Sequence, residues 1–310
     1  MILKRRRFLS LMTAAAPLLW WQSTGGVSSQ GNAAPIDQPP RRYRPTAALA
    51  AYSLRQHFRW SRGKPQQPAE PAIDMYGFID FCAQNDVAAE LTSYFFPPQL
   101  DDRELLKIKR YAFLSGVGIC GTAIGNRFDE LKGDALEQDI RNAERWIDRT
   151  ALLGAGHIRL FAGKARTLAE PERFAQSVAA TKRCAQYAAK RGVMIGIENH
   201  GGITAQTLLR FLDQVDSPWI GINLDTGNFQ AAPYQQIQQC VERAVHVQWK
   251  VTYRDPQGNR IGLDYARVAS ILRDANYSGF VALEYEEDGD PWEQSSGEIR
   301  RMRSALQGFE

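Results

Sequence analysis

The chain has 310 residues, of which 44% are hydrophobic and 23% charged, a composition typical of globular proteins that excludes a wholly disordered chain. Lys and Arg number 38 against 34 Asp and Glu, but four of the basic residues lie within residues 1–34, where no acidic residue occurs. Residues 35–310 therefore hold 34 basic and 34 acidic residues, so this part of the chain is neutral. A neutral body argues against a nucleic-acid binder, because such proteins need clustered cations.

Residues 1–34 are interpreted as an export signal. A basic start is followed by an apolar stretch of about 14 residues, which is too short to span a bilayer comfortably. Arg5-Arg6-Arg7-Phe8-Leu9 resembles the twin-arginine export motif, although an arginine-rich general secretory signal is the alternative. We expect cleavage near Ala33-Ala34, an exposed linker over residues 35–46, and a periplasmic location for the mature protein.

Beyond this segment the chain alternates short apolar runs with longer helical patterns, and no apolar run reaches 18 residues. The clearest helical pattern covers 171–191, with proline in its first turn, apolar residues on one face and glycine beyond its end. The expected strands are 47–54, 87–92, 118–124, 157–161, 193–198, 219–225, 244–251 and 280–286.

Eight strand–helix units predict a single (β/α)₈ TIM barrel over residues 47–307, with its active site at the carboxyl ends of the strands. A doubly wound sheet is the alternative, but no glycine-rich phosphate turn follows any strand. The four cysteines are far apart and form no Cys-x-x-Cys pair. Two disulfides would be compatible with export, yet each cysteine falls in an apolar element, which favours buried free thiols.

Side chains that face the barrel interior follow from the alternation along each strand. This parity brings three carboxylates to the upper ends of the fifth, sixth and eighth strands, with an amide on the seventh. They are Glu198, Asp225, Glu284 and Gln248. Burying three anions without compensation is costly or forces protonation. A divalent cation would resolve this, and oxygen donors suit Mn²⁺, Mg²⁺ or Co²⁺. The alternative is a rim of acids paired with Arg159 and Lys250.

Four segments on the fifth to eighth strands resemble the sugar phosphate isomerase/epimerase family of xylose isomerase-like TIM barrels. Their order and spacing along residues 47–307 carry the resemblance, whereas each segment alone is short. The segments are Ile195-Gly196-Ile197-Glu198-Asn199-His200-Gly201-Gly202, Asn223-Leu224-Asp225-Thr226-Gly227-Asn228, His246-Val247-Gln248-Trp249-Lys250, and Tyr277-Ser278-Gly279-Phe280-Val281-Ala282-Leu283-Glu284-Tyr285-Glu286.

The resemblance implies a divalent metal, Mn²⁺ in the first place with Mg²⁺, Co²⁺ or Zn²⁺ as alternatives, held by Glu198, Asp225, the strand-seven residue and Glu284. It also implies that the two glutamates exchange protons with a keto sugar from opposite faces of an enediolate. The metal polarises the neighbouring carbonyl and so lowers the pKa of the C–H bond.

Two departures from the family pattern stand out. Gln248 occupies the position of the second histidine in the usual His-x-His-x-Lys strand, and its carbonyl is a weaker, neutral oxygen donor. His246 shares its parity but lies about 6–7 Å deeper, so it is an alternative ligand only after a register shift. Thr204 replaces a further glutamate of some ketose epimerases, whereas Arg254 matches an arginine that contacts substrate hydroxyls in those enzymes.

Further substrate-binding candidates lie beside the strand ends. His200 and Asn228 follow the fifth and sixth strands, with a supporting hydrogen bond and a helix cap as their alternative roles. Lys250 is expected to act as an electrostatic clamp rather than a Schiff base, since it lies among acids. Arg159 and His57 complete the set, and loop packing is the alternative for His57.

The last loop, residues 286–290, holds four acids in five residues, which predicts an unphosphorylated polyhydroxy substrate. The leading function is a metal-dependent isomerase or epimerase of a small carbohydrate, with no nucleic-acid partner and oligomeric state left open. A lyase or hydrolase acting on 3-keto-glycosides or inositol derivatives by elimination, and a non-catalytic sugar-binding barrel, are the alternatives. An abasic-site endonuclease is disfavoured because only four histidines are present.

Overall fold

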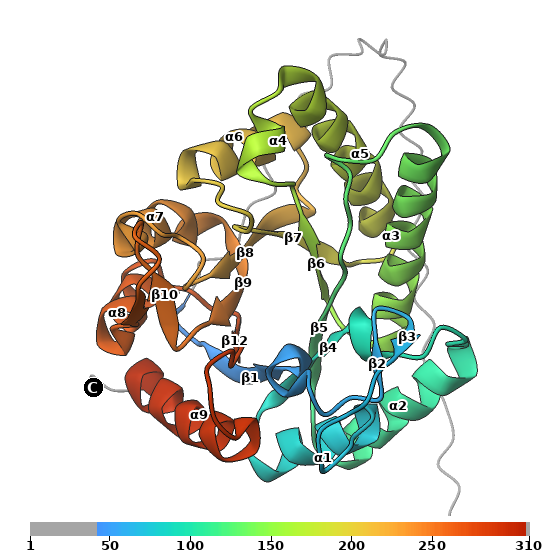
Figure 1. Ribbon diagram of the computed structural model, residues 1–310, viewed down its shortest axis with the longest axis vertical. Helices are drawn as coiled ribbons and strands as arrows, with labels where there is room; N and C mark the ends of the chain where they lie inside the picture. Colours follow the sequence, from blue (N-terminus) through green and yellow to red (C-terminus); the bar gives the residue numbers. More distant parts are fainter. Residues whose placement is uncertain (1–41, 308–310) are drawn as a thin grey trace, which may run out of the picture. The chain divides into compact units, whose positions relative to one another are not determined.

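A computed structural model describes residues 42–307 of the chain. The expected export signal over residues 1–34 and most of the expected linker over residues 35–46 lie outside the described residues, so both stay predictions. The described chain forms a closed parallel β-barrel ringed by helices (Figure 1), which confirms the predicted (β/α)₈ fold.

The barrel strands follow one another around the ring in chain order, and β1 closes it by pairing in parallel with both β12 and β4. Every strand lies within its predicted run, except that β1 begins one residue earlier. The strands are β1 (Thr46–Ala50), β4 (Ala88–Thr92), β5 (Ile119–Ala123), β6 (His157–Phe161), β7 (Met194–Glu198), β8 (Ile220–Asp225), β9 (Ala244–Trp249) and β12 (Phe280–Leu283).

The strands are buried on both faces because helices cover the outside and side chains fill the inside. In β8 all six residues are buried. Ile222 and Leu224 belong to the hydrophobic core around the barrel, whereas the polar side chains of Asn223 and Asp225 are wholly buried on the opposite face of the strand. This separation is the alternation that the sequence predicts.

The helices begin where the sequence supplies capping groups. The side chains of Asp74, Asp101 and Thr204 accept hydrogen bonds from backbone N–H groups in the first turns of α1, α2 and α6, and α5 starts at Pro171. The helices are α1 (Met75–Gln84), α2 (Asp102–Leu114), α3 (Gly133–Leu153), α4 (Ala165–Leu168), α5 (Pro171–Ala189), α6 (Ala205–Val215), α7 (Pro233–Cys240), α8 (Tyr265–Asp274) and α9 (Pro291–Gln307), with short 3₁₀ turns η1 (Ala51–Leu54), η2 (Ser93–Phe95) and η3 (Val241–Arg243).

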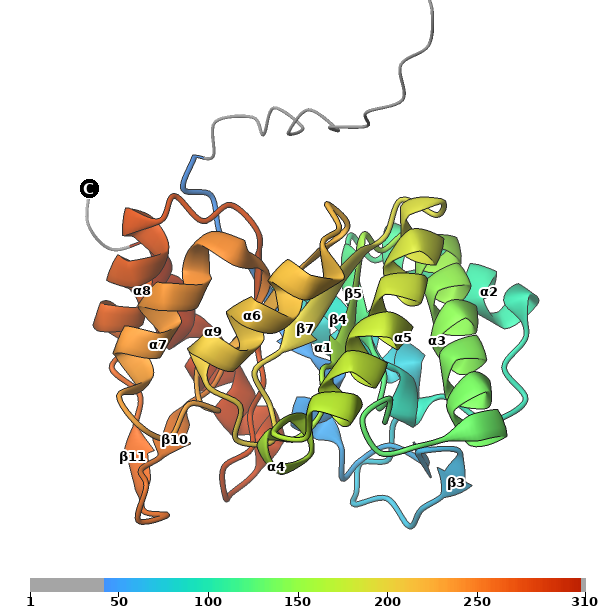
Figure 2. The same ribbon diagram turned by 90° about the horizontal axis from the view of Figure 1, so that it is seen from above.

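Two small hairpins, absent from the sequence prediction, follow the first and seventh barrel strands. They are β2 (Trp60–Ser61) with β3 (Lys64–Pro65), and β10 (Thr252–Arg254) with β11 (Arg260–Gly262). Figure 2 shows both at the same edge of the barrel, opposite the edge where the described chain begins. The edge with the two hairpins carries the carboxyl ends of the strands and is called the mouth below.

The four cysteines are buried and free, as expected for apolar packing positions. Among residues 42–307, no helix combines the length and the apolar character that crossing a bilayer requires.

Candidate functional site

Four neighbouring strands bring polar side chains to the mouth. Glu198 ends β7, Asp225 ends β8, Gln248 lies next to the end of β9, and Glu284 directly follows β12. In the pairing of β8 with β9, Asp225 stands opposite Gln248. All four side chains are more than nine-tenths buried, so each charge or dipole must find its partner within the protein.

Glu198 is held by an arginine from the neighbouring strand. Arg159 Nε lies 2.9 Å from Glu198 Oε2, and both side chains are buried. Arg159 is itself fixed, because one terminal nitrogen donates to the Ile124 carbonyl at 2.6 Å and its guanidinium lies over the Phe161 ring. The other carboxylate oxygen, Oε1, accepts a hydrogen bond from Asn228 Nδ2 at 3.1 Å.

Glu284 is held by the buried side chain of Lys250 and by the side-chain amide of Gln248 on β9. The Lys250 ammonium contacts both Glu284 and Glu286. Gln248 Nε2 donates to Glu284 Oε1 at 3.0 Å, while Gln248 Oε1 accepts from Asn223 Nδ2 at 2.5 Å. Burial disfavours the charged lysine, but the surrounding carboxylates outweigh it and hold the pKa of Lys250 well above its usual value.

Asp225 is oriented through its backbone and one of its two oxygens. Its N–H donates to Asn199 Oδ1 and its carbonyl accepts from Asn199 Nδ2, each at 2.8 Å. Asp225 Oδ1 accepts from the Gly227 N–H at 2.8 Å. The buried Oδ2 accepts no hydrogen bond within the described chain, and Lys250 Nζ lies 3.6 Å from it.

The close approach of this turn to the end of β9 explains the glycine at position 227. A Cβ atom there would lie 2.6 Å from both Lys250 Cγ and the Thr252 carbonyl oxygen. Glycine therefore lets the loop after β8 pack onto the lysine that balances the acids.

Burial leaves the two glutamates hard to ionise. Desolvation raises the pKa of Glu198 above its usual range, and the nearby Asp225 and Glu284 charges add to the rise against the lowering effect of Arg159. Desolvation likewise raises the pKa of Glu284, with Lys250 acting in the opposite direction. Each group therefore releases and accepts a proton closer to neutral pH than an exposed glutamate does.

The expected divalent metal fits the mouth in charge and donor chemistry. When all are ionised, four carboxylates, those of Glu198, Asp225, Glu284 and Glu286, face two cationic side chains, Arg159 and Lys250, which leaves an excess of two negative charges. Asp225 Oδ2 is a buried oxygen without a hydrogen-bond donor among residues 42–307. Hard oxygen donors with excess negative charge are what Mn²⁺ or Mg²⁺ requires.

The side chains are not arranged as a finished cage for an ion, however. Within the described part of the chain, no three His, Cys, Asp or Glu side chains stand close enough to hold a metal together. The Lys250 ammonium lies among the acids, and Gln248 turns its amide nitrogen toward Glu284. An ion at these ligands therefore requires the lysine to move away and the amide to turn.

His246, the alternative metal ligand, lies deeper in the barrel. It stands opposite Asn223, two positions below the Asp225–Gln248 pair, because the β8–β9 register places Gln248 level with the mouth. Its Nε2 is 2.9 Å from Glu90 Oε2, and its ring stacks on that of His157 at 4.5 Å. These residues form a buried layer beneath the mouth. Glu90, on β4, pairs with His246 in this layer.

The remaining sequence candidates divide into two groups. Asn228 and Arg254 line a cavity of about 280 Å³ at the mouth, together with Lys250, and His200 lies against Phe161 with ring centroids 4.5 Å apart. His57 does not reach this cavity within the described structure.

His57 is 4% exposed, its Nδ1 lies 3.1 Å from the Ala69 carbonyl, and its ring packs on Trp292. These contacts correspond to loop packing, the alternative role of His57, and join the segment after β1 to Trp292 in α9.

Sequence reasoning missed two arginines of the mouth, Arg55 and Arg260, which line the same cavity. Arg55 follows η1 and Arg260 begins β11. A signal for Arg55 was available, since it follows the first strand run, where TIM-barrel sites draw their residues. Arg260 depends on the β10–β11 hairpin, whose short strands carry no periodic pattern.

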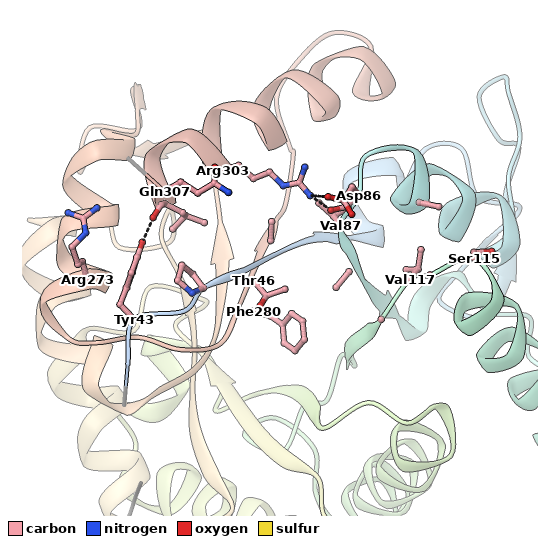
Figure 3. Close-up of a pocket in the computed structure, with 17 residues that line it drawn as sticks. Tyr43, Thr46, Asp86, Val87, Ser115, Val117, Arg273, Phe280, Arg303 and Gln307 are labelled. Atoms are coloured by element: carbon pink, nitrogen blue, oxygen red, sulfur yellow. Dashed lines mark hydrogen bonds and ion pairs between the residues drawn. The ribbon is translucent and has the colours of Figure 1, made fainter. Parts of the chain in front are cut away.

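A larger cavity of about 1430 Å³ lies at the opposite edge of the barrel (Figure 3). Its lining includes Thr46, Ala88 and Phe280 at the amino ends of β1, β4 and β12. An ion pair between Arg303 and Asp86 crosses it, with their side chains 3.1 Å apart. Active sites of (β/α)₈ barrels form at the carboxyl ends, so the smaller cavity at the mouth is the candidate site.

The fold and the mouth together define a (β/α)₈ barrel with buried acid–cation pairs at the carboxyl ends of its strands. The chain belongs to the xylose isomerase-like TIM barrel family, whose sequence model matches residues 76–305. A search of curated proteins finds no match to the chain.

Solved structures with the same fold are distant in sequence. A D-psicose 3-epimerase determined with D-fructose is 16% identical, with a TM-score of 0.67 over 85% of this chain and 100% of that one. A 3-keto-D-glucoside 4-epimerase from E. coli is 14% identical, with a TM-score of 0.62 over 84% and 100%. A probable 3-DHS dehydratase from Bacillus anthracis is 18% identical, with a TM-score of 0.61 over 86% and 100%. At sequence identities this low, the structural similarity shows that these proteins share their fold with this chain.

Proposed function

We propose that the protein is an isomerase or epimerase that moves a proton at the carbon next to a carbonyl group in an unphosphorylated sugar or keto-sugar derivative. The observation that carries this proposal is the pair of buried glutamates, Glu198 and Glu284, at the mouth of the barrel. Each has a raised pKa, and each is oriented by a cation on one oxygen and an amide on the other.

The chemistry needs an acid and a base that flank one carbon atom. A glutamate with a raised pKa is a stronger base than an exposed one and holds its proton closer to neutral pH, which suits both halves of a proton exchange. Arg159 and Asn228 hold Glu198 in place, while Gln248 and Lys250 do so for Glu284. In the proposal, one glutamate removes the proton and the other returns it to the opposite face.

The negative charge that develops on the carbonyl oxygen needs a cation near the two glutamates. Lys250, whose ammonium contacts Glu284, supplies one positive charge there. We propose a divalent metal, with Mn²⁺ as the first candidate, as a second positive charge. Glu198, Asp225, Gln248 and Glu284 would hold the ion, which when bound would polarise the carbonyl and its neighbouring hydroxyl. His200 and Asn228 are proposed to bind substrate hydroxyls beside it.

Proton exchange in D₂O tests this function directly. The protein is incubated with a panel of free ketoses and 3-keto-glucosides, with and without Mn²⁺, and deuterium at the carbon next to the carbonyl is followed by NMR. We expect incorporation with wild-type protein and at least about a hundredfold less with Glu198→Gln or Glu284→Gln. Folded variants that exchange as fast as wild type would rule out the assignment.

A lyase is the second candidate, because an enediolate also expels a leaving group on the next carbon. A probable 3-DHS dehydratase has the same fold, and this likeness supports a lyase as the alternative. Loss of water or an aglycone together with deuterium incorporation would identify it, whereas incorporation with an intact substrate identifies epimerisation. Binding of a sugar without any exchange would instead identify a non-catalytic barrel.

A further inference from the structure

The outer part of the mouth cavity is rich in cations. The charged side chains that line it are Arg55, Lys250, Arg254, Arg260, Glu286 and Glu287. Part of this charge is already balanced: Lys250 contacts Glu286, and Arg260 lies 3.1 Å from Glu287 and 3.2 Å from Asp288. Three of the four acids of the last loop are therefore paired with cations, which weakens the repulsion of anionic substrates that the sequence predicts for this loop.

Two guanidinium groups of this cavity stay without such a partner. Within residues 42–307, neither Arg55 nor Arg254 has a carboxylate oxygen within 4.0 Å, unlike Arg260 beside them. Both are nevertheless anchored by backbone carbonyls. Arg55 donates one terminal nitrogen to Tyr285 at 3.1 Å, and Arg254 donates one to Gly258 at 3.0 Å. A guanidinium has five N–H donors, so most donors of both groups are left for a ligand.

The two arginines reach the cavity from well-separated parts of the chain. Arg55 follows η1 after the first barrel strand, and its guanidinium lies over the Tyr52 ring. Arg254 ends β10, whose turn is closed by Asp255 Oδ1 accepting from the Asn259 N–H at 2.8 Å. The two anchored cations thus line one small cavity that also contains Lys250 and Asn228.

We infer that the mouth binds a carboxylate group of the substrate through Arg55 and Arg254, so that the substrate is a sugar acid, such as an aldonate-type or uronate-type keto acid. This inference rests on the proposed function and names its substrate class. A carboxylate matches the planar donor fork of a guanidinium. It also brings a single negative charge beside Glu286 and Glu287, whereas a phosphate dianion would meet twice that repulsion.

Binding of matched acids and alcohols tests the inference without any need for turnover. Calorimetric titration compares D-gluconate with D-glucitol, D-galactonate with galactitol, and D-xylonate with xylitol, using wild-type protein. We expect at least one acid to bind about tenfold or more tightly than its alditol, the gain expected from hydrogen bonds to a charged group. Arg55→Gln and Arg254→Gln should each remove most of that preference.

Arg103→Gln is the matched control, because Arg103 is exposed on α2 and does not line the mouth cavity. It should keep the full preference, and circular dichroism should show that all three variants are folded. No preference for any acid, or a preference that survives both mouth variants, would overturn the inference. Tighter binding of D-glucitol 6-phosphate than of D-gluconate would overturn the carboxylate in favour of a phosphate.

These outcomes are separable from those of the proton-exchange experiment. Exchange into neutral ketoses, combined with no preference for acids, would preserve the proposed function and refute the inference. Arginine-dependent binding of an acid, combined with no exchange on any ketose, 3-keto-glucoside or 2-keto sugar acid, would preserve the inference of a carboxylate site and refute the proposed function.

Discussion

Lys250 is the side chain on which the charge balance of the mouth depends. Its ammonium contacts Glu284 and Glu286 and lies 3.6 Å from Asp225 Oδ2, the place among the acids that a divalent ion would need. The lysine and the proposed metal would therefore compete for the same carboxylates. The Gln248 amide would favour the lysine in this competition, since a neutral amide oxygen is a weaker metal ligand than an imidazole nitrogen.

Replacing this lysine should strengthen metal binding. We expect Lys250→Met to bind Mn²⁺ about tenfold or more tightly than wild type, because a like charge close to the ion is removed. Titration calorimetry at neutral pH measures the difference, and Lys107→Met, at an exposed lysine on α2, serves as the control. Equal or weaker binding by the Lys250 variant would show that the lysine does not occupy an ion site.

His157, in the buried layer beneath the mouth, should make folding sensitive to acid. Burial, with the neighbouring His246 and Arg159, lowers the pKa of His157 well below its usual value, and neither ring nitrogen has a hydrogen-bond partner in the described chain. The unfolded chain therefore takes up this proton first. Below about pH 6.5, His157 should reduce the free energy of unfolding by up to about 1.4 kcal/mol per pH unit.

Urea denaturation of wild type and His157→Leu between about pH 7 and pH 5 measures this contribution. Leucine has a similar volume and no nitrogen to protonate, so the variant should lose less stability on acidification. Glu198 and Glu284, whose pKa values are raised, act in the opposite direction but are present in both proteins. The difference between the two slopes therefore isolates His157, and parallel slopes would contradict its role.

At the scale of the elements, the loop after β7 ends in the residue that caps the following helix. Thr204 stands where some ketose epimerases are expected to carry a glutamate, and here it caps α6. Its Oγ1 accepts from the Thr207 N–H at 3.3 Å. The helix packs through fully buried Leu208, Phe211 and Leu212, so the cap stabilises the element that supports the end of β7.

Removal of this cap should affect stability and leave chemistry unchanged. We expect Thr204→Ala to lower the free energy of unfolding by about 1 kcal/mol, the usual value of an N-cap, with proton exchange at the wild-type rate. Thr204→Ser keeps the hydroxyl and should restore most of the stability. A loss of exchange in the folded alanine variant would instead give Thr204 a role in the reaction.

At the scale of the whole molecule, closure of the barrel joins the two ends of the described chain. β1 pairs with β12, and the Tyr43 hydroxyl donates to the Leu306 carbonyl at 2.8 Å. One hydrophobic cluster extends from Leu49 to Leu306. Because most of the barrel strands contribute buried side chains to this cluster, the barrel should unfold as one unit.

A cavity in the closing strand tests this cooperativity. Leu283 in β12 is fully buried, and Leu283→Ala should lower the free energy of unfolding by about 2–5 kcal/mol. Tryptophan fluorescence and far-ultraviolet circular dichroism, recorded along a denaturant series, should shift together. Separate transitions for the two signals would show that part of the barrel unfolds independently.

The barrel, the order and approximate position of its strands, and the acids at its mouth could all be predicted from the amino-acid sequence. Each of these follows from local regularities: alternation along a strand places Asp225 inside and Leu224 outside, and apolar periodicity with Pro171 at its start defines α5. The β10–β11 hairpin was not predicted for the same reason, since its turn depends on backbone N–H groups that donate to the Asp255 carboxylate and on no periodic pattern.

Which cation each of these acids contacts depends on the tertiary structure, because the partners lie on different strands. Arg159 reaches Glu198 because β6 lies beside β7, and Lys250 reaches Glu284 because β9 lies beside β12. His57 packs on Trp292, which is far along the chain, and does not line the cavity at the mouth. Distances between residues remote in sequence are set by barrel closure and packing, and the energy of a buried charge depends on those distances.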